Sequence, residues 1–149
     1  MWINPPFLNA WDQIFVLNDG TQKFWFNAIG YLGYHNGAEE AIFFDCQQNN
    51  TENALEPGVW TLVTINVTNS GFEVFYNGEP KFDNENNAAF GGNLTDYSMV
   101  VDLFTSSNDF FLGQRSWWSA APALVDDIYI CGSPLAAEHA AALYNATKK

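Results

Sequence analysis

Residues 60–78, WTLVTINVTNSGFEVFYNG, decide the fold class, because they hold two strand patterns and two turn signals. Val63, Ile65 and Val67 alternate with the polar Thr64 and Asn66, so an extended chain would place the apolar side chains on one face. Asn-Ser-Gly follows the first pattern and Asn-Gly follows the second, and such residues tolerate the positive φ of tight hairpin turns. The stretch therefore predicts a β-hairpin that continues into a second turn.

The same pattern recurs along the whole chain. Asp-Gly separates two further apolar runs near the N-terminus, and Gly- and Asn-rich stretches separate the others. Regularly spaced strands with turns between them favour two packed sheets. We expect an all-β fold, a two-sheet antiparallel β-sandwich. The other strand candidates are residues 11–17, 22–28, 41–46, 97–104, 109–114 and 123–131.

One short helix is expected at the C-terminus, lying on the sandwich. Ser133 suits an N-cap and Pro134 suits the first helical position. A packed His139 is favoured over a metal ligand, since no second His or Cys stands at ligand spacing. The apolar stripe predicted from helical spacing consists of Leu135, His139, Ala142, Leu143 and Ala146.

The charge balance restricts the kind of partner. The net charge is -12, with five Lys and Arg against seventeen Asp and Glu. Binding to nucleic acid or to anionic lipid needs clustered cations, so both partners are disfavoured and a neutral partner is expected. No run approaches the length of a membrane span, and the N-terminal residues lack the pattern of a signal peptide.

Two cysteines, Cys46 and Cys131, each end a predicted strand. A disulfide between them is one interpretation, although neighbouring antiparallel strands bring opposite ends together rather than equal ends. Two buried thiols are the interpretation that the pattern favours.

Several motifs, in the right order, resemble laminin-G-like jelly rolls of the concanavalin A-like superfamily. They are a Trp-x-x-Pro element, a Trp-led strand with a Tyr-Asn-Gly turn, a strand ending in Gly, an Asp-Asp strand and a helix ending in Leu-Tyr. The resemblance implies a jelly roll, a fold that hosts lectins, glycan-binding modules, glycosidases, lyases and adhesion domains. The matching residues are Trp2, Pro5, Trp60, 76–78, Leu112, Gly113, Asp126, Asp127, Leu143 and Tyr144.

The N-terminus departs from that family pattern. Members usually carry one or two strands before the Trp-Pro element, which opens this chain. We therefore expect residues 1–149 to form a single jelly-roll domain that is excised from a larger protein or that receives the strands from another segment, as in a swapped dimer.

The carboxylates do not form the pattern of a glycosidase. Hydrolases of this fold carry a Glu-x-Asp-x-x-Glu type motif that sets two carboxyl groups about 5 to 9.5 Å apart, and no such string occurs. Asp126 and Asp127 point to opposite faces of a strand. We expect no catalysis and no required cofactor. The resemblance allows a structural calcium ion, for which the sequence assigns no ligands.

Aromatic side chains outside the expected core suggest carbohydrate binding. Sugars stack on aromatic rings, and their hydroxyl groups donate hydrogen bonds to planar polar side chains and accept hydrogen bonds from them. Trp117 and Trp118 are adjacent in a Ser/Ala/Gly-rich loop, so one can anchor the loop while the other contacts a ligand. For every candidate the alternative is ordinary packing. The candidate ligand-binding residues are Trp117, Trp118, Trp25, Tyr31, Tyr34, Asn27, Asp45, Gln114 and Arg115.

The expected function is a non-catalytic carbohydrate-binding module for a neutral plant polysaccharide of the xylan, glucan or mannan type. Such a module would be extracellular and tethered to catalytic domains, where effective concentration raises its weak affinity. The alternative is a laminin-G-like adhesion or protein-interaction domain, whose aromatic residues would form the energetic centre of an interface. A glycan-active enzyme is the third interpretation.

Overall fold

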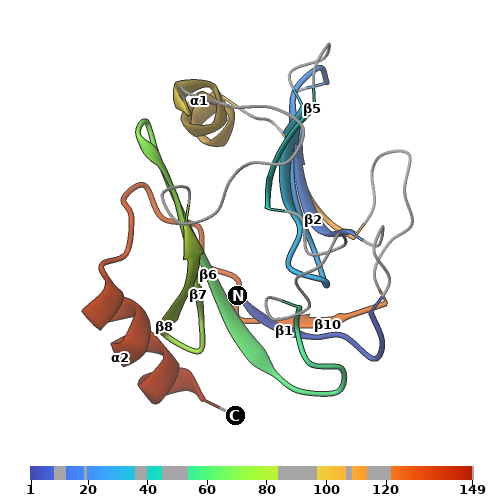
Figure 1. Ribbon diagram of the computed structural model, residues 1–149, viewed down its shortest axis with the longest axis vertical. Coiled ribbons are helices and arrows are strands. Elements are labelled where there is room, and N and C mark those ends of the chain that lie inside the picture. The colour runs from blue at the N-terminus through green and yellow to red at the C-terminus, as the bar shows by residue number, and fades with distance from the viewer. Residues whose placement is uncertain are drawn as a thin grey trace.

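The protein folds into two five-stranded antiparallel sheets that face each other, with one helix at an open end and another on the outside (Figure 1). The structure is a computed structural model, and it describes residues 1–8, 13–18, 20–35, 40–44, 54–83, 97–106, 109–113 and 122–148. The first sheet has the strand order β10-β1-β6-β7-β8 and the second β5-β4-β3-β2-β9. The expected two-sheet antiparallel β-sandwich with a short C-terminal helix is confirmed.

The elements of the first sheet are β1 (Trp2–Asn4), β6 (Thr61–Thr68), β7 (Gly71–Tyr76), β8 (Glu79–Asp83) and β10 (Leu124–Asp126). Those of the second are β2 (Gln13–Asn18), β3 (Lys23–Asn27), β4 (Leu32–His35), β5 (Glu40–Phe44) and β9 (Asp109–Leu112). The helices are α1 (Ser98–Ser106) and α2 (Ala137–Thr147).

The turns form where the sequence predicts them. Between β2 and β3, the Asn18 side-chain Oδ1 accepts a hydrogen bond from the Gly20 N–H at 2.8 Å. Between β7 and β8, Asn77 and Gly78 have φ values of 55° and 84°, the positive pair that a tight I′-type hairpin needs. Both hairpins are therefore fixed by local turn chemistry.

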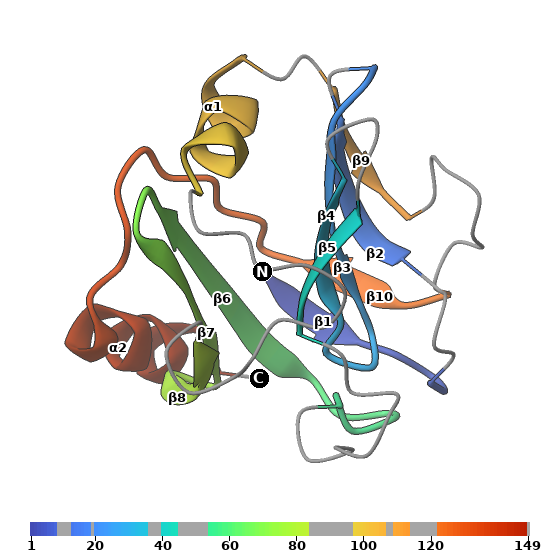
Figure 2. The ribbon, with the colours of Figure 1, turned by 45° about the horizontal axis from the view of Figure 1, so that its top comes forward.

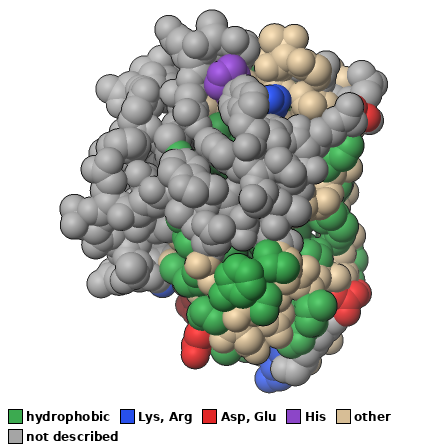
Figure 3. All heavy atoms as spheres, turned by 90° about the vertical axis from the view of Figure 1, so that its right-hand side faces the viewer, with side chains coloured by type: hydrophobic (Ala, Val, Ile, Leu, Met, Phe, Trp, Pro, Cys, Tyr) green, Lys and Arg blue, Asp and Glu red, His purple; other side chains and the backbone are tan. Residues whose placement is uncertain are grey.

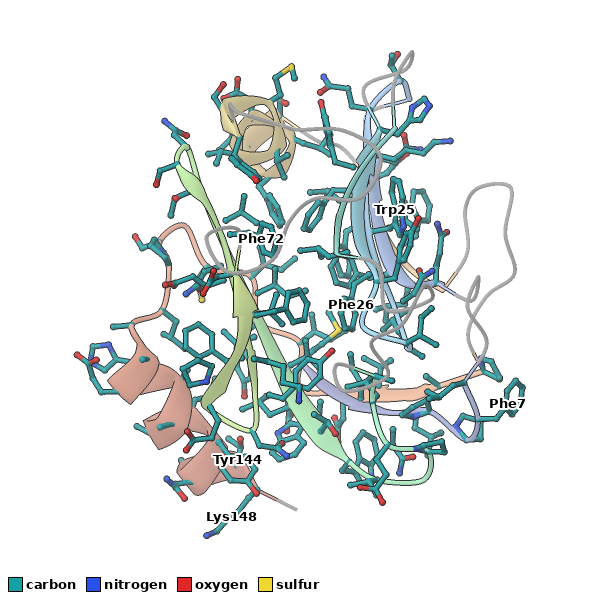
Figure 4. The ribbon with its side chains drawn as sticks, in the orientation of Figure 1. Phe7, Trp25, Phe26, Phe72, Tyr144 and Lys148 are labelled. Carbon is teal, nitrogen blue, oxygen red and sulfur yellow. The ribbon has the colours of Figure 1, made fainter. Side chains whose placement is uncertain are left out.

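Aromatic rings fill the space between the sheets. On the second sheet, the Phe15 ring lies 6.0 Å from Phe24 and 6.3 Å from Phe26, centroid to centroid. On the first sheet, Phe72 packs edge-on against Phe82 at 6.0 Å. Figure 4 shows Phe26 and Phe72 directed into this interior from opposite sheets. Burial of such rings is the main contribution to the stability of the sandwich.

The prediction of a strand at residues 97–104 is wrong, because these residues form helix α1. Tyr97, Val100 and Leu103 are buried and stand at helical spacing. The helix closes the interior between the sheets: Phe104 meets Phe24 of β3 at 5.4 Å, and Tyr97 meets Phe72 of β7 at 6.2 Å (Figure 2). Contacts to both sheets therefore outweigh the preference of the paired valines for a strand.

The C-terminal helix is confirmed, but it starts later and packs with a different face. Its N-cap is Ala136 rather than Ser133. Ala140 is fully buried, whereas the predicted stripe residues His139, Ala142 and Ala146 are exposed. The helix lies on the outer face of the first sheet (Figure 1). The face that it turns toward the sheet is set by its contacts with the β7–β8 turn and with Trp2, and not by hydrophobicity alone.

The predicted strand at residues 123–131 is also too long. Strand β10 ends at Asp126, and Asp127 has a φ of 48°, which turns the backbone out of the extended conformation. Ile128, Tyr129 and Ile130 are exposed beyond it. Cys131 is an exposed free thiol, so the hypothesis of a buried thiol is wrong for this residue, and Cys46 lies outside the described residues.

Candidate functional site

Three of the predicted ligand-binding residues lie together on the second sheet. Trp25 of β3 stacks on Tyr31 with ring centroids 6.5 Å apart and an interplanar angle of 25°. Asn27 stands two residues further along the same strand, so its side chain shares a face with Trp25. Figure 4 shows Trp25 on the side of its sheet that is turned away from Phe72.

A glycine on the neighbouring strand makes room for this indole. Gly33 of β4 is the direct cross-strand partner of Trp25. A Cβ atom at Gly33 would lie 2.3 Å from the Trp25 ring, closer than any real contact. The indole can therefore lie flat over β4, because Gly33 has no side chain that would occupy this space.

Burial gives these residues packing roles. Trp25, Tyr31 and Asn27 have exposed fractions of 1%, 2% and 0%. Tyr34, also buried, shares the opposite face with Phe24, and its hydroxyl donates to the Gln22 side-chain oxygen. The packing alternative raised from the sequence describes these four residues in this structure, and a contact of any of them with a sugar stays a prediction.

The remaining candidates, Trp117, Trp118, Gln114, Arg115 and Asp45, lie outside the described residues. The two ends of the segment that holds the tryptophans are described. At one end, the Gly113 N–H donates to the Ile14 carbonyl at 2.7 Å, which ties the end of β9 to β2. At the other end, Leu124 of β10 pairs with Asn4 of β1. Both anchors are main-chain contacts of the sandwich.

Exposed apolar side chains gather beside the second anchor. We define the apolar rim as Phe7, Val59 and Leu124, which are 54%, 40% and 62% exposed. Two hydrogen bonds join the segments of Phe7 and Val59: Asn4 Nδ2 donates to the Gly58 carbonyl at 3.2 Å, and the Gly58 N–H donates to the Pro5 carbonyl at 2.7 Å. Strand pairing joins the third segment, since Leu124 of β10 lies opposite Asn4 of β1. Figure 3, which faces the right-hand side of Figure 1, shows hydrophobic side chains gathered on the lower part of the molecule.

Phe7 was not among the residues predicted from the sequence. Its signal is the Pro5-Pro6 pair that precedes it, because two prolines end the strand and leave the following ring without a strand neighbour. An exposed aromatic ring and exposed aliphatic groups on neighbouring segments offer apolar surface of the kind that stacks on a sugar ring or on a protein side chain.

Acidic side chains within the described ranges do not cluster. No three His, Cys, Asp or Glu side chains of these ranges come close enough together to hold a metal ion. The Asp126 carboxylate accepts a hydrogen bond from the Asp127 N–H at 2.9 Å, an interaction that supports the turn after β10. This hydrogen bond gives the pair a structural role, and the structural calcium ion that the resemblance allows stays a prediction.

Comparison with known families agrees with this architecture. A family model described as the concanavalin A-like lectin/glucanases superfamily matches residues 1–141. The chain belongs to this superfamily. Members of the superfamily bind carbohydrates or proteins, and some are glycosidases. No curated protein and no solved structure matches the chain significantly. Among the described helices of this superfamily member, none is long and apolar enough to cross a membrane.

Proposed function

We propose that this superfamily domain is a non-catalytic carbohydrate-binding module that recognises a neutral polysaccharide of the xylan, glucan or mannan type. We further propose that it acts outside the cell, tethered to a catalytic domain. Family membership supports a carbohydrate ligand, and the net charge of -12 disfavours polyanionic glycans. The ligand would be held by stacking on exposed rings and by amide and carboxylate hydrogen bonds.

The observation that carries the proposal is the apolar rim beside the anchor of the segment with Trp117 and Trp118. Phe7 is a half-exposed ring, and Leu124 follows that segment by a few residues along the chain. A binding surface composed of the rim and an adjacent loop would leave the core packing untouched, since loops on a rigid scaffold accept ligand contacts without disturbing it.

The absence of catalysis is part of the proposal. In the described ranges Asp126 and Asp127 are consecutive, and the N–H of one binds the carboxylate of the other, so they do not form a pair that flanks a glycosidic bond. We propose no required cofactor. A structural calcium ion would be held by oxygen ligands, and we assign none among the described residues.

Affinity electrophoresis in gels that contain xylan, β-glucan or mannan tests the proposal, with and without a chelator. The wild-type chain should be retarded by at least one neutral polysaccharide. Phe7→Ala, and one or both of Trp117→Ala and Trp118→Ala, should reduce the retardation about tenfold. Tyr129→Ala is the matched control, because Tyr129 is 55% exposed, as Phe7 is, and lies outside the rim.

Three results would contradict the proposal. Equal migration of the wild type in all gels would remove the carbohydrate ligand and favour a protein-interaction domain. Equal retardation of wild type and all three variants would place the site elsewhere. Release of reducing ends from any of these polysaccharides by the purified chain would make it an enzyme, the third interpretation.

A further inference from the structure

A tight turn before β6 carries a carboxylate beside the apolar rim. The Val59 N–H donates to the Glu56 carbonyl at 3.2 Å, and Gly58 has a φ of 78°. With Pro57 as the second residue, this is the pattern of a type II turn, whose first and last Cα atoms lie within about 7 Å of each other. The exposed Glu56 therefore stands next to Val59 of the rim.

The backbone on both sides of Glu56 is held in place. Leu55 is buried, and its N–H donates to the carbonyl of Ala28, just after β3, at 3.1 Å. Pro57 restricts the residue before it to extended conformations. The carboxylate is therefore carried by a backbone that needs little further ordering when a ligand binds, and this lowers the cost of binding.

The turn is also tied to the segment that holds Phe7. The Gly58 N–H donates to the Pro5 carbonyl, and Asn4 Nδ2 donates to the Gly58 carbonyl. The second bond uses an N–H of the Asn4 amide, so the amide oxygen is left to accept from another donor. Figure 4 shows Phe7 directed outward from the chain that follows β1. An exposed ring and two acceptor side chains thus lie on segments that are bonded to each other.

The acceptors indicate which chemical group would bind beside the ring. A carboxylate has two acceptor oxygens and no donor, so its partner must donate. Hydroxyl groups on adjacent carbons of a sugar can each donate to one oxygen, in charge-assisted hydrogen bonds about twice as strong as neutral ones. O-acetylation removes these donors, and a uronate or sulfate group would be repelled by the carboxylate.

We propose that Glu56 recognises a pair of free vicinal hydroxyl groups on a sugar that stacks on Phe7. The ligand class is then a neutral polysaccharide whose sugar is not acetylated at these positions. This specificity rests on the proposed function, in which the apolar rim binds a polysaccharide. It adds the polar contact that selects among such polysaccharides.

Affinity electrophoresis tests this with two forms of each polysaccharide, xylan, β-glucan or mannan, that retards the wild-type chain. One form is fully deacetylated by alkali, and the other is partly O-acetylated with acetic anhydride. The wild type should bind the deacetylated form at least about fivefold more tightly, because acetylation removes the hydrogens that Glu56 accepts.

Three variants separate the carboxylate from the ring. Glu56→Ala should weaken binding to the deacetylated form about tenfold and should bind both forms equally within about twofold. Phe7→Ala should weaken binding to both forms by the same factor, so that the ratio between them stays as in the wild type. Glu79→Ala is the matched control, because Glu79 is an exposed carboxylate on β8, at the opposite edge of the first sheet from β10. It should stay within about twofold of the wild type in both gels.

Two results would overturn this specificity alone. The wild type could bind both forms equally, or Glu56→Ala could keep the preference for the deacetylated form. In either case, retardation of the wild type and its reduction in Phe7→Ala would leave the proposed function standing. A wild-type chain that no polysaccharide retards would overturn both the specificity and the proposed function.

Discussion

At the scale of one residue, Trp25 shows that an aromatic side chain which the sequence suggests as a ligand contact can be buried by packing. The indole is 1% exposed, and Gly33 beneath it leaves no space for a Cβ atom. Trp25→Ala should therefore lower the free energy of unfolding by about 3–5 kcal/mol, measured by urea denaturation. Phe7→Ala is the control and should change it by less than about 0.5 kcal/mol, because this ring is half exposed. A Trp25→Ala chain as stable as wild type would contradict the packing role.

Gly78 lets helix α2 pack closely on the β7–β8 turn, because it has no side chain. Its φ is 84°, and a Cβ atom there would lie 2.5 Å from the Ala141 Cα of helix α2. Gly78→Ala should cost about 1–2 kcal/mol for the left-handed backbone and at least about 1 kcal/mol more for displacing the helix.

Gly58 provides the matched control for this substitution. It has a φ of 78° with nothing within 4 Å of an added Cβ atom, so Gly58→Ala should show the backbone cost alone. Thermal unfolding of both variants measures the difference. Equal losses would mean that α2 does not pack on the turn.

At the residue scale, the sequence predicted the turns well and the exposure of aromatic residues poorly. An Asn-Gly pair acts through its own backbone, so Asn77 and Gly78 are recognisable without any tertiary contact. The burial of Trp25 depends on Gly33 and Tyr31, which come from another strand and from the loop before it. Alternation correctly separated Trp25 from Phe24, but it could not show that both faces of the sheet are covered.

At the scale of elements, substitutions in helix α2 test which face of this helix is buried against the first sheet. Ala140 is fully buried, whereas Ala142, which the predicted stripe included, is exposed. Ala140→Leu should overpack the contact with the sheet and cost about 1–3 kcal/mol, measured by urea denaturation. Ala142→Leu should be neutral within about 0.5 kcal/mol. The reverse order would restore the face predicted from the sequence.

The elements that the sequence predicted wrongly share one physical cause. Residues 97–104 and 123–131 are both rich in β-branched and aromatic residues, which favour strands locally. In α1 the contacts of Tyr97 and Phe104 to opposite sheets select a helix. After β10, the segment has no neighbouring strand among the described residues, so strand propensity alone does not extend the ladder. Contacts between residues far apart in the sequence, or their absence, decided each case.

At the scale of the whole molecule, the order of motifs was enough to predict the sandwich and its superfamily. The charge balance is a global property as well, and it disfavours nucleic acid and anionic lipid as partners without any structure. The proposed binding surface needed the fold, because the apolar rim takes its residues from β10, from the segment after β1 and from the segment before β6. No spacing in the sequence brings Phe7, Val59 and Leu124 together.

The amino group of Met1 should make the free energy of unfolding depend on pH. Burial lowers its pKa from 8.0 to about 6, and the nearby Asp127 carboxylate partly opposes this shift. The unfolded chain therefore binds a proton between about pH 6 and pH 8 that the folded chain does not bind. Stability should rise with pH across this window, by about 2–3 kcal/mol, and the gain should be absent below about pH 6.

Acetylation of the N-terminus isolates this effect. The acetylated chain keeps an N–H for the Val63 carbonyl but has no group to titrate. Every other titrating group is present in both chains, so subtracting their unfolding free energies from pH 5.5 to pH 8.5 leaves the contribution of Met1 alone. We expect the acetylated chain to gain most at the acidic end, because there the free amine must carry its proton inside the sheet. Parallel curves would show that the amine stays hydrated, and the first sheet would then be open to water at Met1.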